Sequence, residues 1–451
     1  MDELAEADEP RRAQDEADIP PGDTIKSKNE PGDRVSGWAK LPLRRLFRVV
    51  NGGTPGGDPQ NWDGGIRWAT PADLGSVDGG FIDRTKRTLT VRGLAQGSAS
   101  VPAGSLVLST RAPIGYIAQT VAETAFNQGC RGLVPRTSLD IRYFRYQLQA
   151  LAGRLAGLGL GSTFMELSAN ALAAVHVQVP ALETQHAIAS SLDRETVRID
   201  ALAAGKRRLI CLLDERAATV IADGFGAEVG FSAMAVPNSI GRHPMVRLGA
   251  LASVQSGLTL DAGRDLGESS VVRPYLRVAN VQDGRVDLAE VKEVGVPLAL
   301  ALRCELRAGD VLLTEGGDPD KLGRGTVWRG EIPGCLHQNH IFAVRPTSAL
   351  LPDFLALLSR TPYARSYFEA TASKTTGIAS TSTSKIASFR VPLLPLHEQR
   401  HVIEETTARL VKITELARLV SRQLDLLSAR RQALITAAVS GELAVPAHRP
   451  A

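Results

Sequence analysis

Residues 396–441 read LHEQRHVIEETTARLVKITELARLVSRQLDLLSARRQALITAAVSG, with no proline and no internal glycine. The apolar positions recur at alternating steps of three and four, and Thr406 and Arg431 interrupt them. They are Ile403, Leu410, Ile413, Ala417, Val420, Leu424, Leu427, Leu434 and Ala438. This period is typical of a helix that packs along another long helix. About 40 residues at ~1.5 Å each predict a rod of roughly 60 Å with one apolar stripe that needs a partner.

A second stretch, residues 182–224, supplies that partner. Its stripe consists of Ile188, Leu192, Ile199, Leu202, Leu209, Leu213 and Val220, with Glu195, Lys206 and Arg216 at intervening positions. The residues before the two helices also match, because VPALETQ (179–185) parallels LLPLHEQ (393–399), and Gln185 corresponds to Gln399. Proline favours helix starts and is excluded from helix interiors. We therefore predict an internal duplication, with long helices over 181–224 and 396–441.

Length and composition predict an ordinary globular protein of two or three domains. The chain has 451 residues, of which 43% are hydrophobic and 22% are charged. No apolar run approaches the roughly 18 residues of a membrane helix, and the N-terminus is acidic. Four scattered cysteines without a Cys-x-x-Cys pair indicate free thiols in a reducing compartment. We expect a cytoplasmic protein without a membrane span.

The net charge of +4 conceals an asymmetry. Residues 1–36 contain 11 Asp/Glu and 5 Lys/Arg and few large apolar groups, so we expect a disordered acidic tail. Solubilisation is one role for such a tail, and mimicry of DNA charge is another. Residues 37–180 contain 15 basic and 8 acidic residues. This basic body is compatible with nucleic acid, although an ordinary solvated surface explains the charge equally well.

Two similar domains are expected to precede the two helices. Residues 37–180 have the glycine and proline spacing of many short strands, with a helical pattern over 141–158. After a linker over 225–243, residues 244–395 repeat this domain weakly, and residues 442–451 form a tail. In our alignment HQNH (337–340) corresponds to NQGC (127–130). The predicted class is α+β: two duplicated mixed α/β domains joined by two long antiparallel coiled-coil helices.

Several short strings, in order and largely duplicated, resemble one protein family. They are NGGTP (51–55), WDGGIRW (62–68), LSTRAPIG (108–115), NQG (127–129), GSTF (161–164) and the helix starts at 180–185 and 395–399. Together they resemble the specificity subunits of type I restriction–modification systems, over residues 38–443. The first helix start departs from the family at Ala181 and Thr184. The second domain lacks the NGGTP and tryptophan strings, so its alignment is looser.

The resemblance implies a function and partners. In that family two target-recognition domains each read one half of a split site in double-stranded DNA, and the helices act as a ruler. Methyltransferase and restriction/translocase subunits carry the chemistry, together with S-adenosylmethionine, ATP and Mg. This chain is then non-catalytic and binds no cofactor. Apolar residues off the helix stripe are our candidates for docking two methyltransferase subunits: Ile210, Leu212, Leu416 and Leu419.

Candidate DNA contacts follow from side-chain chemistry. Arginine pairs with guanine or grips phosphate, and asparagine or glutamine pairs with adenine. In the first domain the candidates are Arg67, Lys86, Arg87, Arg111, Asn127, Gln128 and Arg131. In the second they are Arg277, Asn280, Lys321, Arg324, Gln338, Asn339 and Lys374. Trp68 and Tyr275 are expected in the core rather than as stacking platforms.

Other chemistry has weaker support in the sequence. There is no phosphate-binding loop and no Asn-Pro-Pro-aromatic string of adenine methyltransferases. A nuclease cluster (Glu315, Asp318, Asp320, Lys321) lies in one Gly/Pro loop, and a zinc site (Cys335, His337, His340) lacks a fourth ligand. Two alternatives stay open: a DNA-modifying enzyme with a cryptic active site, and a coiled-coil scaffold.

Overall fold

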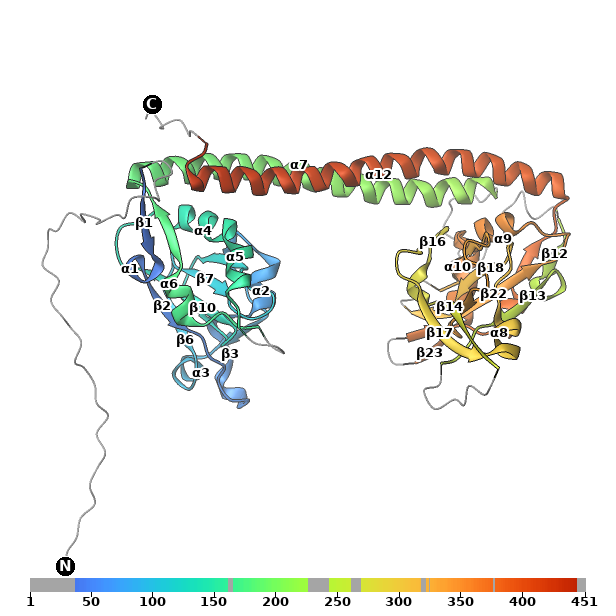
Figure 1. The fold of residues 1–451 in the computed structure, drawn as a ribbon, viewed down its shortest axis with the longest axis horizontal. Helices are drawn as coiled ribbons and strands as arrows, with labels where there is room; N and C mark the ends of the chain where they lie inside the picture. Colours follow the sequence, from blue (N-terminus) through green and yellow to red (C-terminus); the bar gives the residue numbers. More distant parts are fainter. Residues whose placement is uncertain are drawn as a thin grey trace, which may run out of the picture. The chain divides into compact units, whose positions relative to one another are not determined.

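The structure, a computed structural model, describes residues 37–160, 165–225, 243–260, 269–317, 322–323, 325–375 and 378–443. The acidic tail over 1–36 and nearly all of the linker therefore lie outside the described residues. The chain divides into two compact units, one made of residues up to 201 and from 427 on, the other of residues 202–426. Each unit contains a mixed α/β domain and part of both long helices (Figure 1).

The first unit contains the elements up to α6, β11 and the start of the first long helix. They are β1 (Ala39–Pro42), α1 (Leu43–Leu46), β2 (Phe47–Asn51), β3 (Trp62–Ala69), α2 (Pro71–Ser76), β4 (Phe81–Ile82), β5 (Arg87–Leu89), α3 (Val91–Ala95), β6 (Ala99–Val101), β7 (Leu106–Ser109), β8 (Ile117–Thr120), β9 (Thr124–Phe126), β10 (Cys130–Pro135), α4 (Ile141–Ala150), α5 (Ala152–Gly157), α6 (Ala169–Ala174), β11 (His176–Val179) and α7 (Leu182–Gly224).

The second unit contains the remaining elements. They are β12 (Met245–Arg247), β13 (Ala252–Ser256), β14 (Ser270–Leu276), β15 (Val281–Gln282), β16 (Arg285–Val286), β17 (Lys292–Pro297), α8 (Leu298–Cys304), β18 (Val311–Thr314), β19 (Gly316–Gly317), β20 (Gly325–Val327), β21 (Leu336–His337), β22 (Ile341–Pro346), α9 (Pro352–Ser359), α10 (Pro362–Thr371), β23 (Ser373–Thr375), β24 (Ile378–Ser380), α11 (Thr383–Ser388), β25 (Arg390–Pro392) and α12 (Leu396–Ser440), whose last turns belong to the first unit.

The core of the first unit includes both long helices. A five-stranded sheet in the order β2-β10-β7-β8-β4 lies beside a second sheet, β5-β3-β9-β6. Apolar side chains of the first sheet and of α4 pack with Ile188 and Leu192 of α7 and with Ile435 and Ala438 of α12. Figure 1 shows α4 next to α7 and β3 at the remote end of this unit. The long helices are thus part of the domain core and not a separate attachment.

The second unit repeats this arrangement with the roles of the helices exchanged. Its main sheet has the order β13-β22-β18-β20, and β17-β14-β21 forms another. Val220 and Ile221 of α7 and Leu410 of α12 belong to its largest core cluster. Asp223 pairs with Arg409 at 3.3 Å in this unit. In both units the two helices run in opposite directions, as predicted.

The stripe of α12 is confirmed, and that of α7 needs two corrections: Arg216 is exposed and Ala217 packs against the core in its place, and Leu202 is also displaced. The predicted α12 positions are all buried or half-buried. On α7, however, Leu202 is 57% exposed, whereas the adjacent Ala203 is 8% exposed. Ala203 therefore lies at the seam, the line of contact between α7 and α12, and the expected Leu202 is displaced toward solvent. The predicted helix over 141–158 is also two helices, α4 and α5, which meet at Leu151.

One glutamine joins each domain to its long helix. Gln185 accepts from Asp140 N at 3.0 Å and donates to Pro180 O at 2.9 Å. Gln399 accepts from Leu351 N at 2.8 Å and donates to Leu394 O at 2.9 Å. Both side chains are buried, so their amides must be paired. The repeated glutamine of the sequence is thus a clamp between the helix start and the α4 or α9 start.

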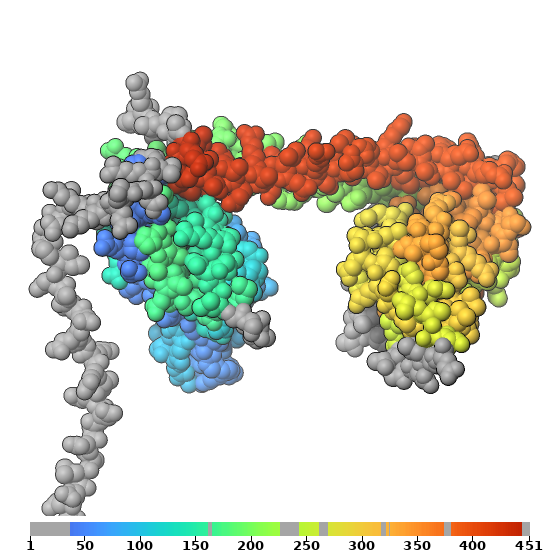
Figure 2. Space-filling view, viewed as in Figure 1, coloured from blue at the N-terminus to red at the C-terminus, as the bar shows by residue number. Residues whose placement is uncertain are grey.

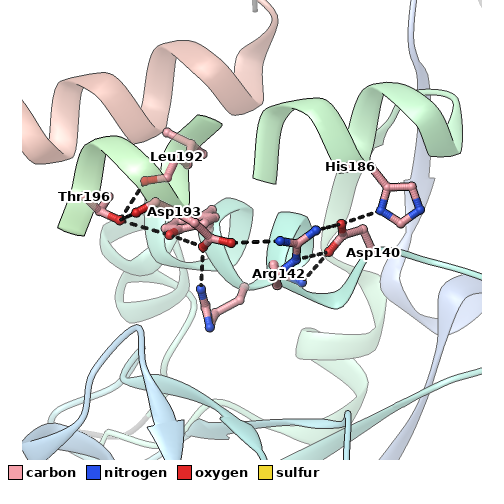
Figure 3. Close-up of polar contacts among 8 residues, drawn as sticks. Asp140, Arg142, His186, Leu192, Asp193 and Thr196 are labelled. Atoms are coloured by element: carbon pink, nitrogen blue, oxygen red, sulfur yellow. Dashed lines mark hydrogen bonds and ion pairs between the residues drawn. The ribbon is translucent and has the colours of Figure 1, made fainter. Parts of the chain in front are cut away.

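A charged network reinforces this joint in the first unit (Figure 3). Asp193 on α7 accepts from Arg142 Nη1 at 2.9 Å, and from Tyr146 Oη at 2.7 Å. Asp140 accepts from Arg142 Nη2 at 2.6 Å and contacts His186 Nδ1 at 2.6 Å. Burial alone would raise the pKa of Asp140, but the bonds from Arg142 and His186 outweigh it and lower that pKa.

The joint of the second unit has a different chemistry. In the second unit Leu351 stands in place of Asp140, Asp353 in place of Arg142 and Leu357 in place of Tyr146. On the long helix, Arg400 stands in place of His186 and Thr407 in place of Asp193. Only the glutamine clamp is shared by the two joints. Each domain is therefore matched to its own long helix by residues that differ between the repeats.

All four cysteines are free, and three of them, Cys130, Cys304 and Cys335, are buried. Burial raises the pKa of Cys130 and of Cys335 to about 12. Among the described helices, none combines the length and the apolar character that crossing a membrane requires. Trp68 and Tyr275 are 6% and 2% exposed, so both belong to the core as expected.

A buried histidine makes the second unit sensitive to acid. The His337 side chain is fully buried, its Nδ1 lies 2.9 Å from Ile341 O, and burial lowers its pKa to about 4. In the unfolded chain the histidine has a pKa of about 6.5, so as the pH falls it is protonated there before it is protonated in the folded protein. The contribution of neutral His337 to the unfolding free energy is therefore fully present above about pH 6.5 and is lost as the pH falls toward 4. We expect a loss of about 2 kcal/mol in unfolding free energy between pH 7 and pH 5.

Urea unfolding of the full chain, followed by circular dichroism at pH 7 and pH 5, measures this loss. The variant His337→Asn keeps a donor near the Nδ1 position but does not titrate. Between pH 7 and pH 5 its unfolding free energy should therefore fall by about 2 kcal/mol less than that of the wild type. Equal pH dependence in both proteins would contradict the assignment to His337.

Candidate nucleic-acid interface

Four loops of the first unit meet at one edge of its main sheet. β10 runs antiparallel to both β2 and β7, so the ends of β2 and β7 lie beside the start of β10. β3 and β9 run parallel and also end here. The backbone bonds that tie the loops together are Asn127 N to Ala69 O (2.9 Å), Cys130 N to Asn127 O (3.0 Å), Gly53 N to Phe126 O (2.9 Å), Thr110 N to Gly129 O (2.8 Å) and Leu167 N to Thr110 O (2.8 Å).

The glycines after β2 are required by close approach to the neighbouring loop. A Cβ atom at Gly52 would lie 2.0 Å from Asn127 O, and one at Gly53 would lie 2.2 Å from Gly97 O. Neither contact is sterically allowed, so only glycine lets these backbones meet. Trp68 Nε1 donates to Gly53 O at 3.1 Å, which ties the loop after β2 to β3. The NGGTP string is therefore a structural part of this edge.

Arg111 and Arg131 come together on one carboxylate, that of Glu166. Arg111 Nε donates to Glu166 at 3.0 Å, and Arg131 Nη2 donates to it at 3.1 Å. The Arg111 side chain is 46% exposed and that of Arg131 is 11% exposed. Arg111 thus remains available to a ligand, whereas Arg131 supports the loop. Sequence reasoning missed Glu166, because no motif marks an isolated acidic residue.

Asn127 and Gln128 lie at the same edge. The Asn127 carbonyl Oδ1 accepts from Gly129 N at 3.0 Å, which closes a tight turn. Gln128 is exposed, and Thr54 Oγ1 donates to its Oε1. The amide nitrogen of Gln128 has no partner among the described residues. Of these two, Gln128 is the better placed to contact a ligand.

The other three candidates of the first domain lie on the β3–β5 pair. Arg67 Nε donates to Asp83 O at 2.7 Å. The Arg87 guanidinium lies 3.3 Å from the centre of the Trp62 ring, a cation–π contact. Lys86 is exposed, and its backbone N donates to Asp73 Oδ1 at 3.0 Å. β3 pairs Arg67 with Thr88 and Trp68 with Arg87, so Arg67 and Arg87 lie on opposite faces of this sheet and do not form one surface.

The second unit has the same loop frame, with one shift from the predicted alignment. Its matching bonds are Gln338 N to Leu276 O (2.9 Å), Ile341 N to Gln338 O (2.8 Å), Leu258 N to His337 O (2.8 Å), Glu315 N to His340 O (2.8 Å) and Thr381 N to Glu315 O (2.8 Å). Gln338, and not His337, therefore corresponds to Asn127. The expected alignment of 337–340 with 127–130 is wrong by one residue, because strand pairing and not letter similarity sets the register.

The missing strings of the second domain have structural counterparts. A Cβ atom at Gly257 would lie 2.2 Å from Gln338 O, as at Gly52 in the first unit. Tyr275 Oη donates to Leu258 O at 2.9 Å, where Trp68 donates to Gly53 O. A single glycine and a different aromatic residue thus preserve the frame.

The exposed chemistry of the two edges differs. β19 pairs Gly316 with Ser380, and these residues stand where Arg111 and Glu166 stand in the first unit. A contact between His340 Nδ1 and the Glu315 carboxylate lies at the same edge instead. An arginine cluster in one unit is therefore replaced by a glutamate–histidine pair in the other.

The remaining candidates of the second domain are scattered or engaged. Asn280 is 4% exposed; its amide bonds Asp287 O, Glu290 O and Arg277 N, which indicates a structural role. Arg277 pairs with Glu290 at 3.0 Å, and Gln338 accepts from Val278 N at 3.2 Å. Asn339 is half-buried at the edge. Lys321, Arg324 and the Lys374 side chain, like Asp318 and Asp320, lie outside the described residues.

No group of three metal-binding side chains occurs in the part of the chain that the structure describes. His337 is fully buried, and His340 contacts Glu315 instead of Cys335. The docking candidates on the helices fall into two groups. Leu212, Leu416 and Leu419 are 47%, 45% and 44% exposed, whereas Ile210 is half-buried.

Comparisons with known proteins point in one direction. A family model described as type I restriction modification DNA specificity domain matches residues 35–208. The type I restriction enzyme MjaIX specificity subunit of Methanocaldococcus jannaschii is 31% identical over 159 residues, which cover 34% of this chain and 37% of that relative. The type I restriction enzyme EcoKI specificity subunit of Escherichia coli is 20% identical over 378 residues, 82% of this chain and 81% of that relative.

One solved structure has a similar fold. It belongs to work described as "Structural basis underlying complex assembly and conformational transition of the type I R-M system". The TM-score is 0.68 at 15% identity, and the match covers 92% of this chain and 100% of that chain. At this identity the likeness concerns the fold alone. The match to the archaeal relative spans little more than a third of its length.

Proposed function

Because this chain belongs to the family of type I restriction–modification DNA specificity proteins, we propose that it is the DNA-recognition subunit of such a complex. Residues 37–180 read one half of a bipartite site in double-stranded DNA, and residues 244–395 read the other half. The chain itself is non-catalytic. Methyltransferase and restriction/translocase subunits supply the chemistry and hold S-adenosylmethionine, ATP and Mg.

One observation supports this function above the others: a shared loop frame that carries different side chains in the two units. Matching backbone bonds hold both edges, yet Arg111 and Glu166 in one unit are Gly316 and Ser380 in the other. A scaffold protein would not need two frames with divergent exposed chemistry. Two readers of different half-sites do need them, because phosphate contacts position a protein on DNA while base contacts specify the sequence.

Binding of the full chain to a DNA duplex at increasing salt tests the proposal. Neutralised phosphates release counterions, so the logarithm of the affinity should fall linearly with the logarithm of the salt concentration, by nearly one unit per phosphate contact. Salt-independent or absent binding would favour the scaffold alternative. Methyl transfer by the isolated chain would favour a cryptic enzyme.

The helices carry an exposed leucine face that fits the proposed methyltransferase partners. Leu202 and Leu212 of α7 and Leu416, Leu419 and Leu426 of α12 each precede a seam residue by one position and are 44–61% exposed. In an antiparallel pair such positions lie on the same side of the seam. The duplication relates Leu202 to Leu416 and Leu212 to Leu426, so these four leucines form two equivalent halves, whereas Leu419 corresponds to Gly205 and has no leucine counterpart. Two copies of one partner are expected to dock there.

Disruption of the leucine face should release the partner. A glutamate at Leu419 places a charge in an apolar contact, and we expect the affinity for the methyltransferase subunit to fall about tenfold or more. Val411→Glu is the matched control: Val411 is 61% exposed on α12 but follows the seam residue Leu410 and so lies on the other side. One side of α12 is visible along its length in Figure 2.

Co-purification from cells that express both proteins measures this effect. The wild-type chain and Val411→Glu should retain two methyltransferase subunits per copy, and Leu419→Glu should lose the subunit that docks on its half of the face. A strict 1:1 complex of the wild-type chain, or equal loss in both variants, would count against the leucine face as the docking surface.

A further inference from the structure

A single carboxylate organises the exposed edge of the first unit. Glu166 accepts from Arg111 Nε through Oε2 at 3.0 Å and from Arg131 Nη2 through Oε1 at 3.1 Å. A backbone bridge also joins Arg111 to Glu166, and the next residue, Leu167, donates to Thr110 O at 2.8 Å. Glu166 therefore meets Arg111 through both its main chain and its side chain.

The two arginines use their guanidinium groups differently. Arg131 Nη1 donates to Gln128 O at 2.8 Å and to Cys130 O at 3.0 Å, so both of its terminal nitrogens are occupied. Arg111 is bound only through Nε, and its Nη1 and Nη2 atoms have no hydrogen-bond partner among the described residues. A guanidinium held by Nε still offers its two terminal nitrogens, which together match guanine O6 and N7 or two phosphate oxygens.

We infer that Glu166 is a positioning residue for DNA recognition, which holds Arg111 by Nε so that its two terminal nitrogens meet the DNA in one orientation. This inference rests on the proposed function. Without Glu166 the long Arg111 side chain samples many rotamers, and ordering it costs binding free energy for the specific contact. In unit 2 Gly316 and Ser380 occupy these positions, so the device belongs to one half-site only.

The positioning effect and simple charge effects have opposite signs. Removal of a carboxylate from a basic surface strengthens attraction to any DNA, whatever its sequence. Loss of an oriented bidentate contact weakens only the binding to the correct sequence. The ratio of the two affinities therefore separates positioning from both charge and overall stability.

The test compares Glu166→Gln with the wild-type full chain on two labelled duplexes of equal length. One duplex contains the methylation motif of the host genome, and the other contains a scrambled sequence. We expect Glu166→Gln to bind the scrambled duplex more tightly than the wild type does, and its affinity ratio between motif and scrambled duplex to fall about fivefold or more. Glu123→Gln is the matched control, since Glu123 is an exposed glutamate of the same unit whose partner is Ser100. Its ratio should stay unchanged.

A double-mutant comparison identifies the route of the effect. In an Arg111→Ala background, Glu166→Gln should cause no further loss of the ratio, because Glu166 acts through Arg111. An undiminished loss in that background would mean that Glu166 contacts DNA itself, and an unchanged ratio in the single variant would also overturn the inference. Loss of binding to both duplexes, as in a misfolded variant, contradicts the expected rise on the scrambled duplex. If the wild type fails to discriminate between the duplexes, the proposed function fails instead.

Discussion

Replacement of residues 38–180 by the equivalent stretch of a relative with another target should change one half of the methylated DNA motif and leave the other half and the spacer unchanged. The reason is that each unit has its own core and its own loop edge. Each mismatched base pair costs roughly 1–3 kcal/mol, so a new half-site of several bases shifts the affinity for the old site by orders of magnitude. Methylation mapping by long-read sequencing, in cells that also express the methyltransferase, measures the motif.

The structure also indicates how to design this exchange. The first domain meets α7 through Asp193, which accepts from Arg142, Arg145 and Tyr146. A chimera that ends at residue 180 brings new residues to face the old Asp193. A second chimera that continues to Thr196 keeps the relative's own joint intact and is the matched control. If both halves of the motif change in the second chimera, recognition by the two domains is not independent.

Lengthening the helix pair should lengthen the spacer between the two half-sites. The hypothesis is that the continuous helices set the distance between the recognition domains. Four added residues extend a helix by about 6 Å and turn it about 40° beyond one full turn. One base pair adds about 3.4 Å, and the duplex turns fully in about 10 base pairs. We therefore expect a spacer longer by one or two base pairs, with both half-sites unchanged.

The insertion must be made at the same level in both helices. In the second unit Asp223 of α7 pairs with Arg409 of α12, so the residue opposite Glu215 lies near Leu416. Insertions after Glu215 and after Glu415 keep the seam paired. An insertion in α7 alone is the control, since it breaks the seam register and should weaken complex assembly. An unchanged spacer in a stable double insertion would remove the ruler hypothesis.

The sequence by itself determined the architecture that depends on local periodicity. Two 3.5-residue repeats over long proline-free stretches can only be long helices with one buried face, and the repeat of Gln185 at Gln399 revealed the duplication. The resemblance to type I specificity subunits followed from strings in a fixed order. Arg111, Gln128 and Arg131 were candidates from the sequence, but the sequence did not show that they lie at one edge. Their spacing along the chain does not give the distances between them in the folded protein.

Only the tertiary structure decided which groups face one another. The match of Gln338 to Asn127 depends on strand pairs between distant segments, and one residue of register moves a side chain to the opposite face. The exposures of Leu202 (57%) and Ala203 (8%) show that Ala203 lies at the contact between the two long helices, which the spacing of leucines in the sequence did not indicate. The role of Glu166 follows from a bridge across 55 residues of sequence separation to Arg111. Such contacts arise from backbone pairing between remote loops, for which local composition provides no signal.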